Sequence, residues 1–187
     1  MKNEKQKLAK GKLLISEPFM KDPNFQRTIL VLCHHDKNGS FGLVLNRKLT
    51  YKIGDAIEEL NFFDVPLHYG GPVQLNTLHF LHKRGDIVEN SVKLAEGLYW
   101  DGKLEQIIRY IKNGEITEKD IQFYVGYSGW ESGQLAGEYE EKSWLVTDIF
   151  PEYVFEQLTD KMWQQVLRDM GGQYKMMSNF PIDPSFN

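Results

Sequence analysis

Residues 28–46 read TILVLCHHDKNGSFGLVLN and carry the clearest structural signal in the chain. The run 28–35 is apolar and rich in β-branched side chains, which predicts a strand that is buried on both faces. The next five residues, 36–40, have the aspartate, asparagine and glycine that are typical of a tight turn. FGLVLN, at 41–46, then returns as a second strand. These residues predict a β-hairpin in the core of the protein.

Further strands and separate helices are expected on both sides of this hairpin. Apolar residues at helical spacing predict one helix after Asp101, which can cap it, and another after Thr159 or Asp160. Gly114 and Gly171 should end these two helices. The other expected strands are 13–16, the two arms of VPLHYGGPV (65–73), 78–82, 92–94, 120–125 and 144–148, and the other expected helices are 53–60 and a short one within 133–143. Hairpins with separate helices, rather than regular βαβ units, favour an α+β fold.

The composition is that of one globular domain. The chain has 187 residues, of which 41% are apolar and 26% are charged, and no linker or repeat marks a boundary. We expect a flexible basic arm at 1–10, where most of the five lysines between Lys2 and Lys12 lie, and a single domain at 11–187. No apolar run approaches the roughly 20 residues of a membrane helix, and the N-terminus lacks a signal-peptide core. Together with a single cysteine, these features favour a cytoplasmic protein.

Cys33 stands beside His34 and His35, which raises the question of a metal site or an activated thiol. On a regular strand, Cys33 and His35 would share one face and His34 would lie on the other. Two ligands are too few for a zinc site, and the chain has no C-x-x-C or H-E-x-x-H spacing. We therefore predict no metal, no cofactor and an inert, buried cysteine, with metal binding and an activated thiol as the alternatives.

GYSGW at 126–130 and GLYWDGKL at 97–104 are similar to catalytic motifs, but each lacks an essential residue. Trp130 occupies the last glycine position of G-x-S-x-G, and no histidine follows His82, whereas α/β-hydrolases place theirs after the serine. Leu104 replaces the hydroxyl residue that holds magnesium in a P-loop. We expect a strand that ends in a glycine turn at the first motif and a strand followed by a helix at the second. Neither motif predicts an enzyme.

Taken together and in order, several segments resemble the YqgE/AlgH family of bacterial proteins. They are GKLLISEP, DPNFQRTILVLCHHDKNGSFGLVLNR, YGGPV, LHFLH, GYSGWESGQLAGE, WLV and the helix that contains Trp163, and they extend over about 11–171. The resemblance implies a compact α+β fold with a curved, partly barrel-like sheet in the bacterial cytoplasm. Family members often carry the label of transcriptional regulator.

This chain departs from the usual family pattern at three positions. His34 stands where glutamate is usual, Lys48 stands where proline is usual, and Ala136 stands where a glutamate commonly follows GQL. Any chemistry that relied on those acidic groups would be lost. The resemblance brings no catalytic residues, so it implies fold and compartment more than function.

Three glycine-containing or polar segments are the candidates for a binding surface. They are NRK (46–48), YGGPV (69–73) and GYSGWESGQ (126–134), which combine bare backbone with hydrogen-bonding and flat aromatic side chains. We predict that they converge on one exposed surface that binds a small ligand or a protein partner. The alternative is that Trp130 and the glycines close the core, with YGGPV lying against GYSGW. The candidate residues are Asn46, Arg47, Tyr69, Gly70, Gly71, Pro72, Tyr127, Ser128, Gly129 and Trp130.

The sequence as a whole favours a non-enzymatic binding or regulatory protein without a membrane segment. A small enzyme of unknown reaction type and a direct DNA-binding regulator are the alternatives. The net charge of −4 gives no overall attraction to nucleic acid, and the chain has no helix-turn-helix signature, zinc finger or basic recognition helix. Direct nucleic-acid binding is therefore not expected, and any regulation is expected to be indirect.

Overall fold

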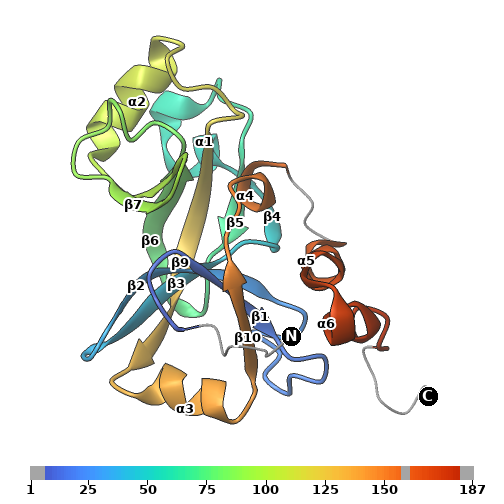
Figure 1. Cartoon of the computed structure of the whole chain (residues 1–187). Helices are drawn as coiled ribbons and strands as arrows, with labels where there is room; N and C mark the ends of the chain where they lie inside the picture. The colour runs from blue at the N-terminus through green and yellow to red at the C-terminus, as the bar shows by residue number, and fades with distance from the viewer. Residues whose placement is uncertain (1–6, 157–160, 182–187) are drawn as a thin grey trace.

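The computed structural model describes residues 7–156 and 161–181. Within these ranges, ten strands form one open sheet that is almost entirely antiparallel, with helices against it (Figure 1). The two strands at its ends, β10 (Trp144–Asp148) and β7 (Val92–Ala95), do not pair with each other, so the sheet is not closed into a barrel. The predicted α+β class is confirmed.

The predicted hairpin is formed by β2 (Ile29–Asp36) and β3 (Gly39–Val44). Leu32 pairs with Gly42, but His34 pairs with Phe41, so Cys33 is an extra residue that forms a β-bulge. A bulge shifts the alternation of side chains by one residue beyond it. The expectation that Cys33 and His35 share a face was based on a regular strand, and it is wrong because the strand is not regular at this point.

The long strand β9 (Ile121–Glu131) connects the two halves of the sheet (Figure 1). It pairs with β3 at one end and with two other strands at the opposite end. β1 (Lys12–Ser16) lies between β10 and β2, and β8 (Leu98–Trp100) lies between β6 and β7. β6 (Val73–His82) pairs with β9. β5 (Pro66–Tyr69) is parallel to β9 and pairs on its other side with β4 (Lys48–Lys52).

The predicted glycine turn at 126–130 is wrong, because these residues continue β9. Gly126 has a left-handed φ of +66°, and opposite it residues 74–77 of β6 form a large bulge between the Val73 and Leu78 pairs. A Cβ atom on Gly126 would lie 2.6 Å from the carbonyl oxygen of Gly71. The glycine therefore lets the strand bend against a neighbouring backbone without ending it.

The helices predicted after Asp101, within 133–143 and before Gly171 are present, whereas α4 (Glu152–Phe155) and α6 (Gly172–Met177) were not expected. The predicted helix 53–60 is interrupted because Ile57 has an extended backbone. Asp101 does not cap the next helix; it has a φ of +60°, and Lys103 takes the cap position. Thr159 and Asp160 lie outside the described residues. The helices are α1 (Ile53–Ala56), the short 3-10 helix η1 (Glu58–Leu60), α2 (Leu104–Lys112), α3 (Gln134–Glu140), α4 (Glu152–Phe155), α5 (Met162–Met170) and α6 (Gly172–Met177).

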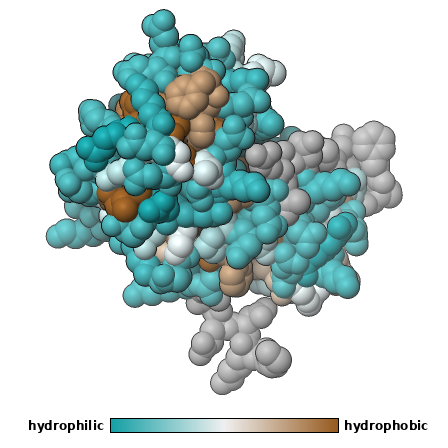
Figure 2. Space-filling model, turned by 90° about the horizontal axis from the view of Figure 1, so that it is seen from above, coloured by the Kyte–Doolittle hydropathy of each residue, from teal (hydrophilic) through white to brown (hydrophobic). Residues whose placement is uncertain are grey.

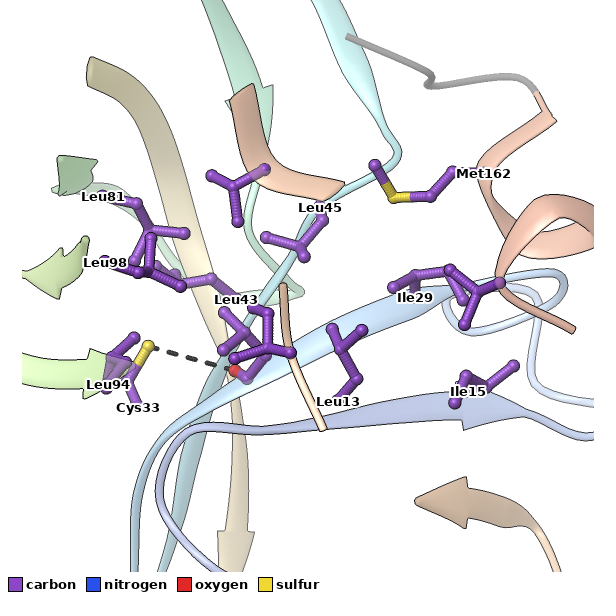
Figure 3. Packing of buried hydrophobic residues seen from close by; sticks show 14 of the residues in the cluster. Leu13, Ile15, Ile29, Cys33, Leu43, Leu45, Leu81, Leu94, Leu98 and Met162 are labelled. Atoms are coloured by element: carbon purple, nitrogen blue, oxygen red, sulfur yellow. Dashed lines mark hydrogen bonds between the residues drawn. The ribbon is translucent and has the colours of Figure 1, made fainter. Parts of the chain in front are cut away.

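Three apolar clusters form the core. The first includes Cys33 and Met162 (Figure 3). Trp163 of α5 also belongs to it. The second lies under α2 and includes Phe123. The third lies on the other side of the hairpin and includes Trp130. Successive residues of β2 enter the first and third clusters in alternation, which confirms the predicted strand with two buried faces.

The outer surface is mostly hydrophilic with small apolar areas when it is seen from the end that carries α1 and α2 (Figure 2). Among the described residues, no helix has both the length and the apolar character needed to span a membrane. The predicted arm at 1–10 falls partly outside the description. Of its described part, Leu8 packs against the third core cluster.

Candidate functional site

The segments YGGPV and GYSGW meet backbone to backbone. The amide of Gly70 donates to the carbonyl oxygen of Val125 at 2.9 Å, and the hydroxyl of Ser128 donates to the carbonyl oxygen of Gly70 at 3.3 Å. A Cβ atom on Gly71 would lie 2.2 Å from the carbonyl carbon of Tyr127. These glycines are therefore required for close contact between two strands, which is the alternative that the sequence left open.

Four of the predicted surface residues are buried, namely Gly70, Gly71, Ser128 and Trp130. Ser128 is fully buried, and Trp130 is 6% exposed within the third core cluster. Tyr127 is half-buried and stacks on Phe41, with 4.7 Å between ring centroids. The expectation that Ser128 and Trp130 belong to one exposed surface is wrong, because the strand continues and turns them inward. Gly129 and Pro72 are exposed.

Asn46, Arg47 and Tyr69 do converge, but they contact the protein's own loop at 22–28. The Arg47 guanidinium donates to the carbonyl oxygens of Pro23 and Gln26 at 3.1 and 3.2 Å. The side chain of Asn46 donates to the carbonyl oxygen of Arg27 at 2.8 Å and accepts from the amide of Ile29 at 3.0 Å, and the Tyr69 hydroxyl donates to Asn24 at 3.3 Å. These side chains hold the loop in place, which is a structural role.

Cys33 lies in the first core cluster and is fully buried (Figure 3). Burial raises the pKa of the thiol well above its usual value, because the thiolate would lose its hydration, and the negative charge of Asp101 acts in the same direction. The prediction of a buried core cysteine is confirmed. Across residues 7–156 and 161–181, no group of three or more His, Cys, Asp or Glu side chains is close enough to hold a metal ion.

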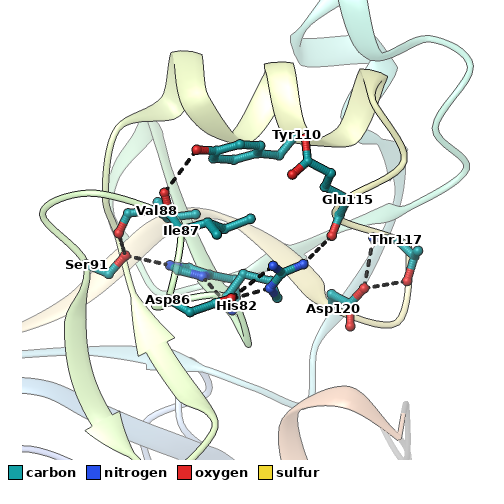
Figure 4. A network of polar contacts seen from close by, with 10 residues as sticks. His82, Asp86, Ile87, Val88, Ser91, Tyr110, Glu115, Thr117 and Asp120 are labelled. Atoms are coloured by element: carbon teal, nitrogen blue, oxygen red, sulfur yellow. Dashed lines mark hydrogen bonds and ion pairs between the residues drawn. The ribbon is translucent and has the colours of Figure 1, made fainter.

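His82 is also a structural residue (Figure 4). Its ring is fully buried, and its Nδ1 accepts a hydrogen bond from the amide of Arg84 at 3.2 Å. The proton is therefore on Nε2, which donates to the carbonyl oxygen of Asp101 at 2.9 Å. Burial lowers the pKa of the ring. Arg84 in turn binds Asp86 and the carbonyl oxygen of Glu115, so this network holds the loop after β6.

Several charged, polar and apolar side chains line an open hollow of about 610 Å³. It lies between segment 7–10, the β2–β3 turn and the junction of β9 with α3. This size is within the range of small-molecule sites. The lining residues are Lys7, Leu8, Ala9, Lys10, His35, Asp36, Lys37, Ser40, Glu131, Ser132, Gly133, Leu135 and Ala136.

His35 and Ser40 form a polar pair in the wall of this hollow. Nδ1 of His35 lies 2.7 Å from the hydroxyl oxygen of Ser40, across the β2–β3 ladder. The bulge at Cys33 directs His35 away from the cysteine and toward the hollow, which Leu8 and Leu135 also line. In the part of the chain that the structure describes, no side chain or backbone group is hydrogen-bonded to Nε2 of His35.

Positive charge exceeds negative charge around the hollow. Three ammonium groups line it, and none of them forms an ion pair with a carboxylate of the described chain. The Asp36 carboxylate already accepts from the amide of Asn38 at 2.7 Å and lies 3.3 Å from His34, and these contacts lower its pKa. Glu131 is the other carboxylate. The hollow is therefore suited to an anion.

Sequence reasoning found this site only in part. The LCHHDKNG stretch drew attention to His35 and Asp36, and the segment 126–134 includes Glu131, Ser132 and Gly133. The basic arm expected at 1–10 includes Lys7 and Lys10, and the turn expected at 36–40 includes Ser40. No local pattern predicts that these three residues lie beside His35, because the fold alone brings them together.

The fold and the hollow define an α+β protein with one open, bulged sheet and a polar, cation-lined depression at the end of the central hairpin. The chain belongs to the AlgH-like family, whose family model matches residues 13–175.

Relatives of similar length support this assignment. UPF0301 protein CT0663 of Chlorobaculum tepidum is 42% identical over 187 residues and covers 100% of both chains. A UPF0301 protein of Cytophaga hutchinsonii is 42% identical over 181 residues, which is 96% of this chain and 100% of the relative. These names state a family without an activity.

Solved structures show the same fold. The solution structure of the AlgH protein from Pseudomonas aeruginosa superposes with a TM-score of 0.73 at 27% identity, covering 97% of this chain and 98% of that one. The crystal structure of protein DIP2367 from Corynebacterium diphtheriae gives a TM-score of 0.82 at 24% identity and covers 95% of each chain. The latter likeness concerns the fold alone.

Proposed function

We propose that this protein is a non-enzymatic binding protein whose ligand is a small anion held in the hollow beside His35 and Ser40. The observation that supports this proposal is the meeting of three lysines and a histidine–serine pair around one hollow of about 610 Å³. Lysine ammonium groups and neutral hydrogen-bond donors are the groups that proteins use to bind phosphate and carboxylate.

Ligand binding at this position would link three parts of the chain that are far apart in sequence. Segment 7–10, the turn at 35–40 and the start of α3 each contribute one wall. An anion between them would reduce the repulsion among the lysines and hold the walls together. A regulatory role would then be indirect. It would depend on the ligand, because a partner protein would bind this surface when the anion is present.

The first experiment is a titration of ¹⁵N-labelled protein with inorganic phosphate, observed by NMR. We expect amide shifts at 35–40 and 131–136, and we expect Lys37→Gln to weaken binding about fivefold, because it removes roughly 1 kcal/mol of charge attraction. Lys21→Gln is the matched control, since Lys21 is exposed and does not line the hollow. Shifts confined to another region, or equal affinity in all three proteins, would refute the site.

The same hollow supports a second candidate function, that of a serine hydrolase. Its support is the 2.7 Å distance from Nδ1 of His35 to the hydroxyl oxygen of Ser40. In that reaction the Ser40 oxygen would attack an ester carbonyl and pass its proton to His35, which would return it to the leaving alcohol before water releases the acid. Ser40 is only 9% exposed, and no carboxylate among the described residues is hydrogen-bonded to His35, so binding is the better-supported function.

A fluorophosphonate probe separates the two candidates. Covalent labelling of Ser40, lost in His35→Gln, would favour the hydrolase. We expect no labelling. Binding of the protein to immobilised duplex DNA in the same buffer tests the DNA-binding alternative. Retention of the protein that falls steeply with salt concentration would show direct phosphate contacts.

A further inference from the structure

The hollow has an apolar side as well as a cationic one. Leu8, Ala9, Leu135 and Ala136 contribute to its lining together with the charged residues. Leu8 is partly buried and packs against the third core cluster, to which Leu135 belongs. The apolar wall is therefore continuous with the core, and it is held in position by packing.

The polar and apolar groups are unevenly distributed over the elements that line the hollow. The turn of the hairpin supplies only polar groups, among them His35, Lys37 and Ser40, whereas segment 7–10 supplies Leu8 and Ala9 together with two lysines, and α3 supplies Leu135 and Ala136. Two of the apolar residues are alanines, whose small side chains leave space in front of the wall. A ligand whose charged group lies at the hairpin would extend its remaining atoms toward Leu8.

From this arrangement we infer that the ligand is an amphipathic anion, with one phosphate or carboxylate head and a short apolar body that contacts Leu8. This inference rests on the proposed function, because it takes the anion site as given and adds the chemical class of the ligand. Leu8 is then a specificity residue, since it selects the apolar body and does not touch the charged head.

The affinity should therefore depend on the length of the ligand's alkyl chain. Each methylene group that leaves water for an apolar wall should improve binding about fourfold. We therefore expect the affinity of the full-length protein to rise in the series inorganic phosphate, ethyl phosphate, butyl phosphate and hexyl phosphate, with hexanoate binding more tightly than acetate. The measurement is isothermal titration calorimetry, supplemented by NMR for the weakest probes.

Two variants separate this inference from the proposed function. Leu8→Ser should reduce the gain per methylene group to less than about twofold; because Leu8 also packs segment 7–10 against the core, this gain is measured within the variant's own series of phosphates. Lys37→Gln should weaken every probe by a similar factor and leave the gain per methylene group unchanged. Thermal unfolding of each variant confirms that it is folded.

The possible outcomes are distinct. If inorganic phosphate binds at the hollow but hexyl phosphate binds no better, the inference fails and the proposed function stands. If no phosphate binds at the hollow, both fail. If affinity rises with the length of the alkyl chain and Leu8→Ser does not reduce this gain, the apolar body lies elsewhere and Leu8 does not have the proposed role.

The same chemistry could belong to a free metabolite or to a lipid headgroup. Cosedimentation with vesicles of phosphatidylcholine containing 10% phosphatidic acid distinguishes these sources. Soluble hexyl phosphate that binds without vesicle association indicates a free amphiphile. Vesicle association that is lost in Leu8→Ser indicates a lipid headgroup as the source of the same amphipathic anion, and vesicle association that Leu8→Ser retains, without binding of hexyl phosphate, contradicts the inference.

Discussion

Trp130 and Trp144 donate to the same oxygen atom, Oε2 of Glu138, from their indole nitrogens at 2.9 and 2.8 Å. The two rings meet edge to face with centroids 6.0 Å apart. Trp130 is on β9, Trp144 is on β10 and Glu138 is on α3. One carboxylate thus satisfies two buried donors and fastens the helix across the third core cluster.

Removing this acceptor should destabilise the fold. Glu138→Ala leaves both indole donors without a partner, and we expect the free energy of unfolding in urea to fall by about 2–4 kcal/mol. Glu138→Gln keeps one carbonyl oxygen and should cost about half as much. Glu140→Gln, at an exposed position of the same helix, is the control and should change stability by less than about 0.5 kcal/mol. Equal stability of all three variants would show that the shared acceptor does not stabilise the helix.

Cys33 should be chemically inert in the native protein. Because burial raises the pKa of the thiol, iodoacetamide at neutral pH should modify it only when urea unfolds the chain. Cys33→Ala should lower the free energy of unfolding by about 1–2 kcal/mol through lost packing. Rapid alkylation of the folded protein, followed by mass spectrometry, would contradict this prediction.

Stability should fall when the pH is lowered from about 7 toward 4. Burial lowers the pKa of His68 to about 4, whereas an unfolded histidine titrates near 6.5, so the unfolded chain binds the proton first. At pH 5 this difference should have removed about 2 kcal/mol of the unfolding free energy present at pH 7.5.

The variant His68→Gln isolates this contribution. It should be less stable than the parent at pH 7.5, and its stability should change less between pH 7.5 and pH 5. His34→Gln is the control, since more than half of the His34 side chain is exposed. If the urea midpoints of parent and His68→Gln fall in parallel, His68 does not titrate as stated.

Two glycines should respond to alanine in opposite directions. A Cβ atom on Gly70 would lie 2.2 Å from the carbonyl oxygen of Gly126, so Gly70→Ala should cost more than about 3 kcal/mol or prevent folding. Gly137 is in α3 and has open space around the added atom, so Gly137→Ala should stabilise the protein by up to about 1 kcal/mol. Thermal and urea unfolding measure the stability changes of both variants. A Gly70→Ala variant as stable as the parent would disprove the close contact between the strands.

The sequence by itself determined the elements whose signals are local. The apolar run of β2, the stripe of α2 that buries Ile107 and Ile111, and the stripe of α5 around Trp163 are periodic patterns within one segment, so each could be recognised without its neighbours. The α+β class followed from their order. The resemblance carried by the same segments led to the family that the comparisons show.

Only the tertiary structure decided which residues form the candidate site. A single bulge at Cys33 moved His35 to the opposite face, and continuation of β9 buried Ser128 and Trp130, although each sequence is also compatible with the regular strand or the turn that was predicted. Lys10 and Ser132 line the same hollow although more than a hundred residues separate them in the chain. Strand pairing sets such distances, and it depends on contacts between segments that no local pattern encodes.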